Sequence, residues 1–259
     1  MNRLQKLFDN KQNNILSVYF TAGFPHLGST VEIIRQLDKQ GVDLIEVGVP
    51  FSDPMADGPV IQHSSTVALR NGMTLDLLLD QVCQARQSCP DIPLVLMSYL
   101  NPMMRYGLPR LFERCAKIGI DAMIIPDLPF DNYLADVKPL CDRYDIPLIM
   151  LVTPETSPQR VRLIDSHCDG FIYMVSSAST TGTRENFDQQ QLDYFHRLDA
   201  MRLDHHRLIG FGISNRATFK AACDNASGAI VGSRFIKCLA ETPDDIPAAV
   251  TALIRSLRP

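Results

Sequence analysis

The stretch ILSVYFTAGFPHLGSTVEIIRQLDKQGVDLIEVGV, residues 15–49, decides the fold. It begins with a short apolar run typical of a β-strand and ends with a second run of the same kind. Between these runs, Val31, Ile34 and Leu37 follow the spacing of an amphipathic helix, which Gly41 ends. A helical crossover of this length makes the two strands parallel neighbours in one sheet. The stretch is therefore predicted to form one strand–helix–strand unit.

The same alternation continues to the end of the chain. Further strands are expected at 93–99, 122–126, 147–152, 170–176, 207–213 and 228–232. Helical patterns lie near 74–88, 108–118, 131–144, 158–166, 188–203, 215–224 and 244–257, and Leu4, Leu7 and Phe8 indicate a short leading helix. Eight strand–helix units in about 250 residues are typical of a TIM barrel. We therefore predict an α/β fold, a (β/α)8 TIM barrel with a short N-terminal helix, as a single domain over residues 1–259.

The alternative architecture is an open, doubly wound sheet. Such sheets usually carry a nucleotide-binding loop directly after the first strand. The loop at that place, TAGFPHLGST (21–30), is neither GxGxxG nor a Walker A sequence. The closed barrel is therefore the preferred prediction.

Composition excludes several classes of protein. With 46% hydrophobic and 21% charged residues, the chain has the make-up of an ordinary globular protein with a large core. A formal net charge of −4 provides no basic field for nucleic acid or an anionic membrane. No apolar run approaches the roughly 20 residues of a spanning helix, and the start lacks a signal-peptide core. The seven cysteines are scattered without a CxxC pair, so we expect free thiols and a cytoplasmic location.

The second predicted strand holds one acidic side chain among branched apolar ones. Alternation along 44–49 turns the branched residues toward the helices and Glu46 into the barrel. A carboxyl group in that position is desolvated, which raises its pKa and suits it to carry protons near neutral pH. The alternative is a structural Glu paired with a buried Arg, but no predicted strand has Lys or Arg inside it, since Arg207 only opens one. We therefore favour a catalytic role for Glu46.

The loop after this strand, PFSDPMADGPVIQ (50–62), carries Asp53 and Asp57. It is long for a strand–helix connection, and its prolines and Gly58 restrict its shape. Asp57 precedes a position where a helix can begin, so capping or a turn explains either aspartate as well as chemistry does. If Asp57 is catalytic, we expect it to be wetter than Glu46 and ionised, which gives the two carboxyls different protonation roles.

Glycine-containing loops are expected at the carboxyl ends of the last strands. IGFGIS and IVGSR follow the seventh and eighth predicted strands, and SSASTTGTR follows the sixth. TIM barrels commonly bind phosphate at this place with backbone N–H groups and a helix N-terminus. Tight turns without a ligand are the alternative. The candidate residues of these loops for a phosphate site are Thr181, Gly182, Thr183, Gly210, Gly212, Gly232 and Ser233.

The positions of the lysines and histidines exclude two classes of reaction mechanism. All seven lysines fall in predicted helices, their flanks or the N-terminal segment, so a Schiff-base mechanism has no nucleophile. No histidine cluster stands at the strand ends, so no metal site is expected, and the pair His205–His206 is interpreted as a solvated helix end. The remaining possibility is acid–base chemistry by carboxyls on a phosphorylated small molecule. Tyr173, on the sixth strand, is a candidate helper, although a strand tyrosine more often packs.

The stretch IEVGVPFSDPMADGP (45–59) closely resembles the signature of the tryptophan synthase α subunit family. YFTAGFP, YLNP, IPDLP, GFGIS and VGS follow in the family's order, so the resemblance covers essentially the whole chain. It implies retro-aldol cleavage of indole-3-glycerol phosphate to indole and glyceraldehyde 3-phosphate, in the last steps of L-tryptophan biosynthesis.

The resemblance also implies roles for individual residues. Glu46 would move protons at the indole carbon and the adjacent hydroxyl, and Asp57 would stabilise positive charge developing at the indole nitrogen. Tyr173 matches a position near the reacting atoms, and Phe20 and Ile61 match positions that line the substrate pocket. The matches to the family's phosphate site are Gly182, Gly212, Gly232 and Ser233.

A partner is implied as well. Members of the family work with a β subunit that carries pyridoxal phosphate, in an α2β2 heterotetramer. The resemblance therefore implies no cofactor on this chain, and it implies that Asp53 and Pro54 contact the β subunit.

One loop departs from the family pattern. The family often has S-R-x-G-V-T-G after the sixth strand, whereas this chain has Ser177 in place of the Arg and Ser179 in place of the first Gly. The resemblance makes this loop a mobile lid, so the departure leaves open a stand-alone lyase that releases free indole. A second alternative is a catalytically silent partner that binds a phosphate ligand and regulates a β subunit, which the presence of both Glu46 and Asp57 disfavours. A different phosphate-binding barrel, such as an isomerase or epimerase, is disfavoured by the second-strand signature.

Overall fold

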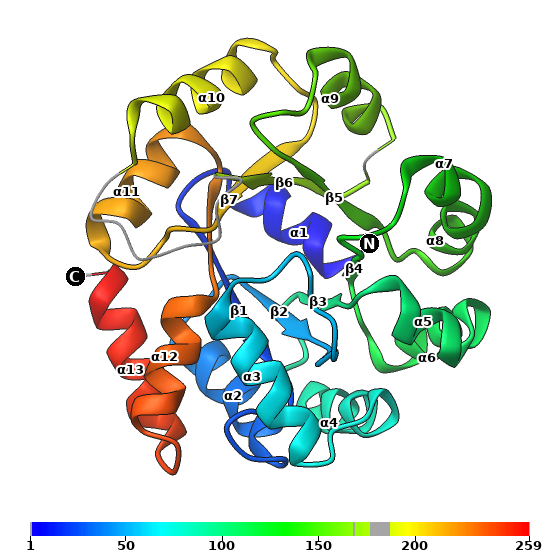
Figure 1. The fold of residues 1–259 in the computed structure, drawn as a ribbon, viewed down its shortest axis with the longest axis vertical. Coiled ribbons are helices and arrows are strands. Elements are labelled where there is room, and N and C mark those ends of the chain that lie inside the picture. The colour runs from blue at the N-terminus through cyan, green and yellow to red at the C-terminus, as the bar shows by residue number, and fades with distance from the viewer. Residues whose placement is uncertain (1, 168, 177–186, 259) are drawn as a thin grey trace.

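Parallel strands form a closed barrel in the computed structural model, which describes residues 2–167, 169–176 and 187–258 (Figure 1). Each strand is hydrogen-bonded to the next in chain order, and β8 returns to pair with β1. The predicted TIM barrel is confirmed. The strands are β1 (Ile15–Thr21), β2 (Leu44–Gly48), β3 (Leu94–Met97), β4 (Ala122–Ile124), β5 (Leu148–Val152), β6 (Phe171–Val175), β7 (His206–Gly210) and β8 (Gly228–Val231).

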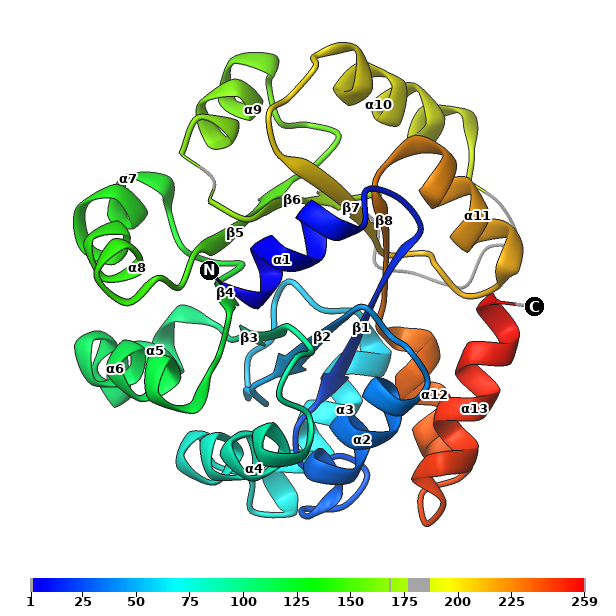
Figure 2. The same ribbon diagram turned by 180° about the vertical axis from the view of Figure 1, so that it is seen from behind.

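Helices surround the barrel (Figures 1 and 2). They are α1 (Arg3–Asn10), α2 (Ser29–Lys39), α3 (Pro59–Arg70), α4 (Leu75–Ser88), α5 (Leu100–Tyr106), α6 (Leu108–Ile118), α7 (Phe130–Asn132), the π-helical segment η1 (Tyr133–Val137), α8 (Lys138–Tyr144), α9 (Pro158–Asp165), α10 (Gln189–Ala200), α11 (Arg216–Asn225), α12 (Ser233–Glu241) and α13 (Ile246–Leu257). The pattern at 131–144 is divided among α7, η1 and α8. Helices α3, α5 and α12 were not predicted. The seven and nine residues of α5 and α12 are too few for a clear helical period, and for α3 the sequence indicated only that a helix can begin after Asp57.

Local chemistry determines where several helices begin. The side chain of Thr74 accepts a hydrogen bond from the backbone N–H of Leu77 at the start of α4. Asp188 and Asn215 form capping boxes at the starts of α10 and α11. Helix α3 begins at Pro59, which needs no N–H partner in the first turn.

Side chains alternate along the strands between two apolar layers. The outer layer lies between barrel and helices and includes Ile45, Val47 and Val49. The inner layer fills the barrel and includes Leu44, with inward-facing residues of the other strands. Glu46 falls between Ile45 and Val47, so it points into the barrel, as predicted.

Helix α1 closes the barrel at the end where the strands begin (Figure 2). Leu4 and Phe8 are buried in the inner layer with the first residues of β1, β2 and β6. The ring of Phe8 lies 5.9 Å from that of Phe171 and stacks at 4.5 Å on that of His206. Access to the interior is therefore restricted to the carboxyl end of the strands.

Candidate active site

Glu46, on β2, is a fully buried carboxyl group inside the barrel. Its exposed fraction is 0%, and the hydroxyl of Ser17 on β1 donates a 2.7 Å hydrogen bond to its Oε1. Its other oxygen, Oε2, is buried and has no hydrogen-bond partner among the described residues. Burial raises the pKa of Glu46 to about 7, although the bond from Ser17 opposes the rise. The group is therefore poised to gain or lose a proton near neutral pH.

Asp57 lies in the loop between β2 and α3. The hydroxyl of Tyr99 donates a 2.9 Å hydrogen bond to its Oδ2, and burial raises its pKa to about 6. Asp57 is only slightly more exposed than Glu46, at 6% against 0%, so the loop carboxyl is buried as well. The reason is that Tyr99 also accepts the backbone N–H of Ala56 at 2.9 Å, which fastens the loop over the end of β3.

Two tyrosines share the space that these carboxyls face. Tyr173 on β6 has a pKa raised well above its ordinary value, first by burial and then by the charges of Glu46 and Asp57. The pKa of Tyr19 on β1 is also raised, first by burial and then by charges that include those of Asp57 and Glu46. Glycines make room for both rings, because a side chain on Gly48 would collide with Tyr19 and one on Gly210 with Tyr173. The structure therefore brings Glu46, Asp57 and Tyr173 close enough together for the two carboxyls to affect the tyrosine's pKa.

The prediction for Phe20 is wrong. Phe20 is fully buried in the outer layer, packed between barrel and helices. Tyr19 is the inward residue, because it lies directly opposite Glu46 in the β1–β2 register. The alternation of Ser17, Tyr19 and Thr21 with apolar neighbours was the signal that identifies this face.

Three of the predicted phosphate-binding residues, Gly212, Gly232 and Ser233, lie at the carboxyl ends of β7 and β8. Gly232 precedes α12, and Ser233 is its first residue; this helix begins without a side-chain cap, which leaves its first N–H groups free for a ligand. A Cβ on Gly232 would lie 3.3 Å from Cδ1 of Tyr19 and 3.7 Å from Cδ1 of Ile61, so Ile61 and Gly232 border the same space.

Gly212 follows β7, and its φ of +77° requires the left-handed conformation that glycine adopts freely. Its loop leaves the barrel beside that of Gly232, because β7 and β8 are paired with Gly210 opposite Ile230. Thr181 and Gly182, with Ser177 and Ser179 of the same loop, lie outside the described residues.

Asp53 and Pro54 lie at the outer part of the β2–α3 loop. Asp53 is exposed, Pro54 is half-buried, and the neighbouring Met55 is 90% exposed. The same loop thus buries Asp57 against the site and presents its other end to solvent.

Three residues of the site were not predicted to be functional: Ser17, Tyr19 and Tyr99. Ser17 and Tyr19 could be found from the period of two in β1. Tyr99 lies in the YLNP motif directly after β3, so its place at the carboxyl end of a strand was the available signal.

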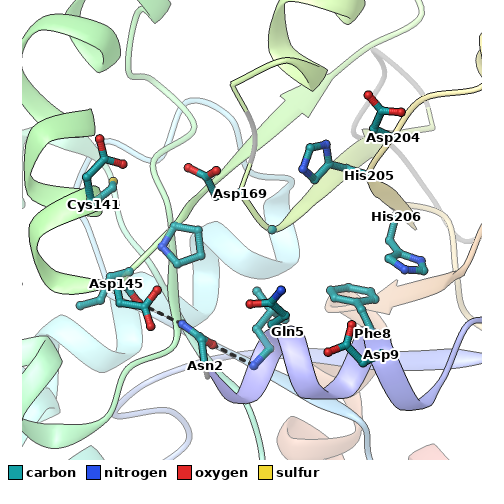
Figure 3. A pocket seen from close by; sticks show the side chains of 15 residues that line it. Asn2, Gln5, Phe8, Asp9, Cys141, Asp145, Asp169, Asp204, His205 and His206 are labelled. Atoms are coloured by element: carbon teal, nitrogen blue, oxygen red, sulfur yellow. Dashed lines mark hydrogen bonds between the residues drawn. The ribbon is translucent and has the colours of Figure 1, made fainter.

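A hollow of about 580 Å³ lies at the amino end of the barrel, beside α1 (Figure 3). Its lining includes Asp9, Asp145 and His206. The interpretation of His205 and His206 as a helix end is wrong, because His206 opens β7 and stacks on Phe8. The amino end of a TIM barrel serves stability, so this hollow is separate from the candidate site.

The described residues contain no group of three or more His, Cys, Asp or Glu side chains that could hold a metal ion. Each of the seven lysines lies in or beside a helix and none is buried, so no lysine reaches the barrel interior. No helix in the described ranges is long and apolar enough to cross a membrane.

Comparison with known proteins identifies the family. The family model for the tryptophan synthase alpha chain matches residues 4–258. The tryptophan synthase alpha chain of Parabacteroides distasonis is 53% identical over 260 residues, covering 100% of both chains. That of Bacteroides fragilis is 56% identical over 241 residues, covering 93% of this chain and 91% of the relative.

Solved structures with a similar fold belong to the same family of proteins. A structure of Mycobacterium tuberculosis tryptophan synthase superposes with a TM-score of 0.88 at 30% identity, covering 100% of this chain and 99% of the other. A tryptophan synthase alpha chain from Legionella pneumophila gives 0.88 at 31% identity, covering 99% and 96%. With this barrel and this pair of buried carboxyls, the chain belongs to the tryptophan synthase alpha chain family.

Proposed function

We propose that this chain cleaves indole-3-glycerol phosphate into indole and glyceraldehyde 3-phosphate by carboxyl acid–base catalysis. The observation that carries the proposal is the pair Glu46 and Asp57, two buried carboxyls with pKa values raised to about 7 and about 6. Both lie close enough to Tyr173 for their charges to contribute to its raised pKa. Groups with pKa values near the working pH transfer protons most effectively.

The reaction needs a proton at the ring carbon that carries the glycerol chain. In the proposed mechanism, Glu46 delivers this proton and the indole ring becomes a cation. Asp57, as carboxylate, stabilises the positive charge at the ring nitrogen. Glu46 then takes the proton of the adjacent hydroxyl, which becomes the aldehyde carbonyl. The carbon–carbon bond breaks, and its electron pair restores the aromatic indole. No lysine or metal is required for this sequence.

The phosphate of the substrate would bind at the carboxyl ends of β7 and β8. The free N–H groups at the start of α12 and the hydroxyl of Ser233 are suitable donors. Gly212 and Gly232 allow the backbone to approach the ligand, and we assign Thr181 and Gly182 to the same site from the family pattern. Ile61, beside Gly232, would line the indole side of the pocket with Tyr19.

A β subunit that carries pyridoxal phosphate would complete the enzyme in an α2β2 assembly. The exposed part of the β2–α3 loop, with Asp53, Pro54 and Met55, is our candidate contact. A loop that meets the partner at one end and holds Asp57 at the other could transmit β-subunit binding to the reacting groups. We also place the enzyme in the cytoplasm, which suits the free cysteines of the described chain.

The test is indole release from indole-3-glycerol phosphate by the purified chain, with and without a β subunit. Slow release that rises strongly with the β subunit supports the coupled enzyme. Fast release by the chain alone indicates a stand-alone lyase, and no release in either case indicates a silent binding protein.

Substitution of Glu46 tests whether its carboxyl group transfers the proton. Glu46→Gln should lower kcat by about 100-fold or more, since it removes the titrating group and keeps the shape. Glu113→Gln is the matched control, because Glu113 lies on the outside of α6 in a surface ion pair with Lys117. Near-normal turnover of Glu46→Gln would refute the assignment.

A further inference from the structure

Ser17 and Glu46 form a buried pair on neighbouring strands of the barrel. Both have an exposed fraction of 0%, and the Ser17 hydroxyl lies 2.7 Å from Glu46 Oε1. Ser17 is opposite Leu44 in the register, one inward position closer to the amino end of β1 than Tyr19. The Ser17 hydroxyl therefore approaches Glu46 from the amino end of the barrel, away from its open end.

This bond makes the two oxygens of Glu46 unequal. Oε1 accepts the Ser17 hydroxyl, whereas Oε2 is buried without a partner among the described residues. A buried polar atom without a partner is costly, so its presence needs a reason. When the carboxyl gains a proton, Oε2 is the oxygen that carries it, because Oε1 already receives a hydrogen.

We propose that Ser17 is a positioning residue for Glu46, whose hydroxyl holds Oε1 so that Oε2 exchanges the proton with the substrate. The inference rests on the proposed function of Glu46 and extends it to a residue without contact to the substrate. Ser17 would act through orientation, and its loss would therefore lower kcat more than it changes KM.

Most groups that face Glu46 do not titrate in the same pH range, so the titration of Glu46 can be measured. The pKa values of Tyr19 on β1 and Tyr173 on β6 are raised far above neutrality, so both hydroxyls stay uncharged between about pH 5 and pH 9. Val95 on β3, opposite Glu46, is apolar. Among the described residues, Asp57 is the other group at the site that titrates near neutral pH, with a pKa of about 6. The bond from Ser17 lowers the pKa of Glu46, so its removal raises that pKa.

The first test measures the pKa of Glu46 in the folded protein without substrate. The chain has only six glutamates, so carboxyl-¹³C glutamate labelling gives a spectrum that Glu46→Gln assigns. Ser17→Ala should raise the pKa of Glu46. Ser17→Thr and Ser17→Val have nearly equal volumes and differ in the hydroxyl, so Thr should keep the pKa low and Val should raise it. Equal pKa values in the Thr and Val variants would overturn the proposal, even if Ser17→Ala folds poorly.

The second test measures indole release as a function of pH. Ser17→Ala should lower kcat about 10-fold, with KM within about 2-fold, and move the alkaline limb, where Glu46 loses the proton that it must deliver, to higher pH. Ser17→Thr should recover both properties. Ser65→Ala, which removes another buried hydroxyl from α3, should change neither. Unchanged kcat and pH limb in Ser17→Ala would overturn the proposal.

The Glu46→Gln background separates the two hypotheses. If Glu46→Gln is inactive and Ser17→Ala is normal, the role of Ser17 fails while the proposed function stands. If Glu46→Gln is active, the proposed function fails, whatever Ser17 does. If both are correct, adding Ser17→Ala to Glu46→Gln lowers the residual rate no further, because the titrating carboxyl is already gone.

Discussion

The hydroxyl of Tyr99 donates a 2.9 Å hydrogen bond to Asp57 and accepts the backbone N–H of Ala56 at the same distance. One side chain at the end of β3 thus holds both the carboxyl and the backbone of the loop after β2. The ring of Phe51 lies 5.2 Å from that of Tyr99 and adds a packing contact to the same loop. The position of Asp57 therefore depends on a residue from another strand.

Tyr99→Phe should lower kcat about 10-fold, since it removes one hydrogen bond to a charged group and keeps the ring. The pKa of Asp57 should rise, because the bond from Tyr99 lowers it. The measurement is the pH dependence of indole release. Tyr106→Phe is a matched control, because the Tyr106 hydroxyl bonds Asp76 on the outer helices. A Tyr99→Phe profile that superposes on the unmodified enzyme would rule this role out.

Stability should fall with rising pH because of Glu46. Its pKa is about 7 in the folded chain and near 4.5 when exposed, so the folded state binds the proton more tightly. The resulting stabilisation is complete below pH 4.5, decreases as pH rises, and is lost above about pH 7.

Urea unfolding of the unmodified chain and Glu46→Gln at pH 5 and pH 8 measures this effect. Between these conditions the variant should gain up to about 3 kcal/mol relative to the unmodified chain. A difference in unfolding free energy that stays constant with pH would contradict the raised pKa.

Gly232→Ala should weaken binding of the phosphorylated substrate. The added Cβ would lie 3.3 Å from Tyr19 and occupy the start of α12, where the phosphate is expected. KM should rise about 10-fold with a smaller change in kcat, as kinetics with indole-3-glycerol phosphate would show. Gly28→Ala is the control, since Gly28 also precedes a helix and has open space around it. Equal KM values in the two variants would argue against a phosphate site here.

Replacement of Tyr19 and of Phe20 should have different consequences. Phe20→Leu should lower the unfolding free energy by about 1 kcal/mol and leave KM and kcat of the folded enzyme unchanged, because Phe20 packs in the outer layer. Tyr19→Leu should impair catalysis, because Tyr19 faces the carboxyls. Thermal unfolding and steady-state kinetics on both variants decide the matter. A kinetic defect confined to Phe20→Leu would mean that the inward face of β1 is the other one.

The barrel and the place of Glu46 could be predicted because both depend on local periodicity. Alternation of strand and helix patterns indicates the barrel, and alternation within 44–49 turns Glu46 inward. Phe20 lies on the outer face of β1, whereas the alternation of the strand turns Tyr19 inward, opposite Glu46.

Other parts of the site depend on contacts between distant segments. Asp57 and Tyr99 are 42 residues apart in the chain, so neither the burial of Asp57 nor its partner can be read from the loop alone. Ser17 and Glu46 are 29 residues apart, and the register of β1 on β2 determines that they meet. Side-chain partners across strands follow from register, which a sequence pattern specifies only in part.

Helix α1 gives the barrel a floor. With Leu4 and Phe8 packed beneath the first residues of the strands, the interior is a cup with one rim. A neutral product formed beside Glu46 has to depart over the same rim by which its precursor arrived, so a partner docked on that rim would control where the product goes.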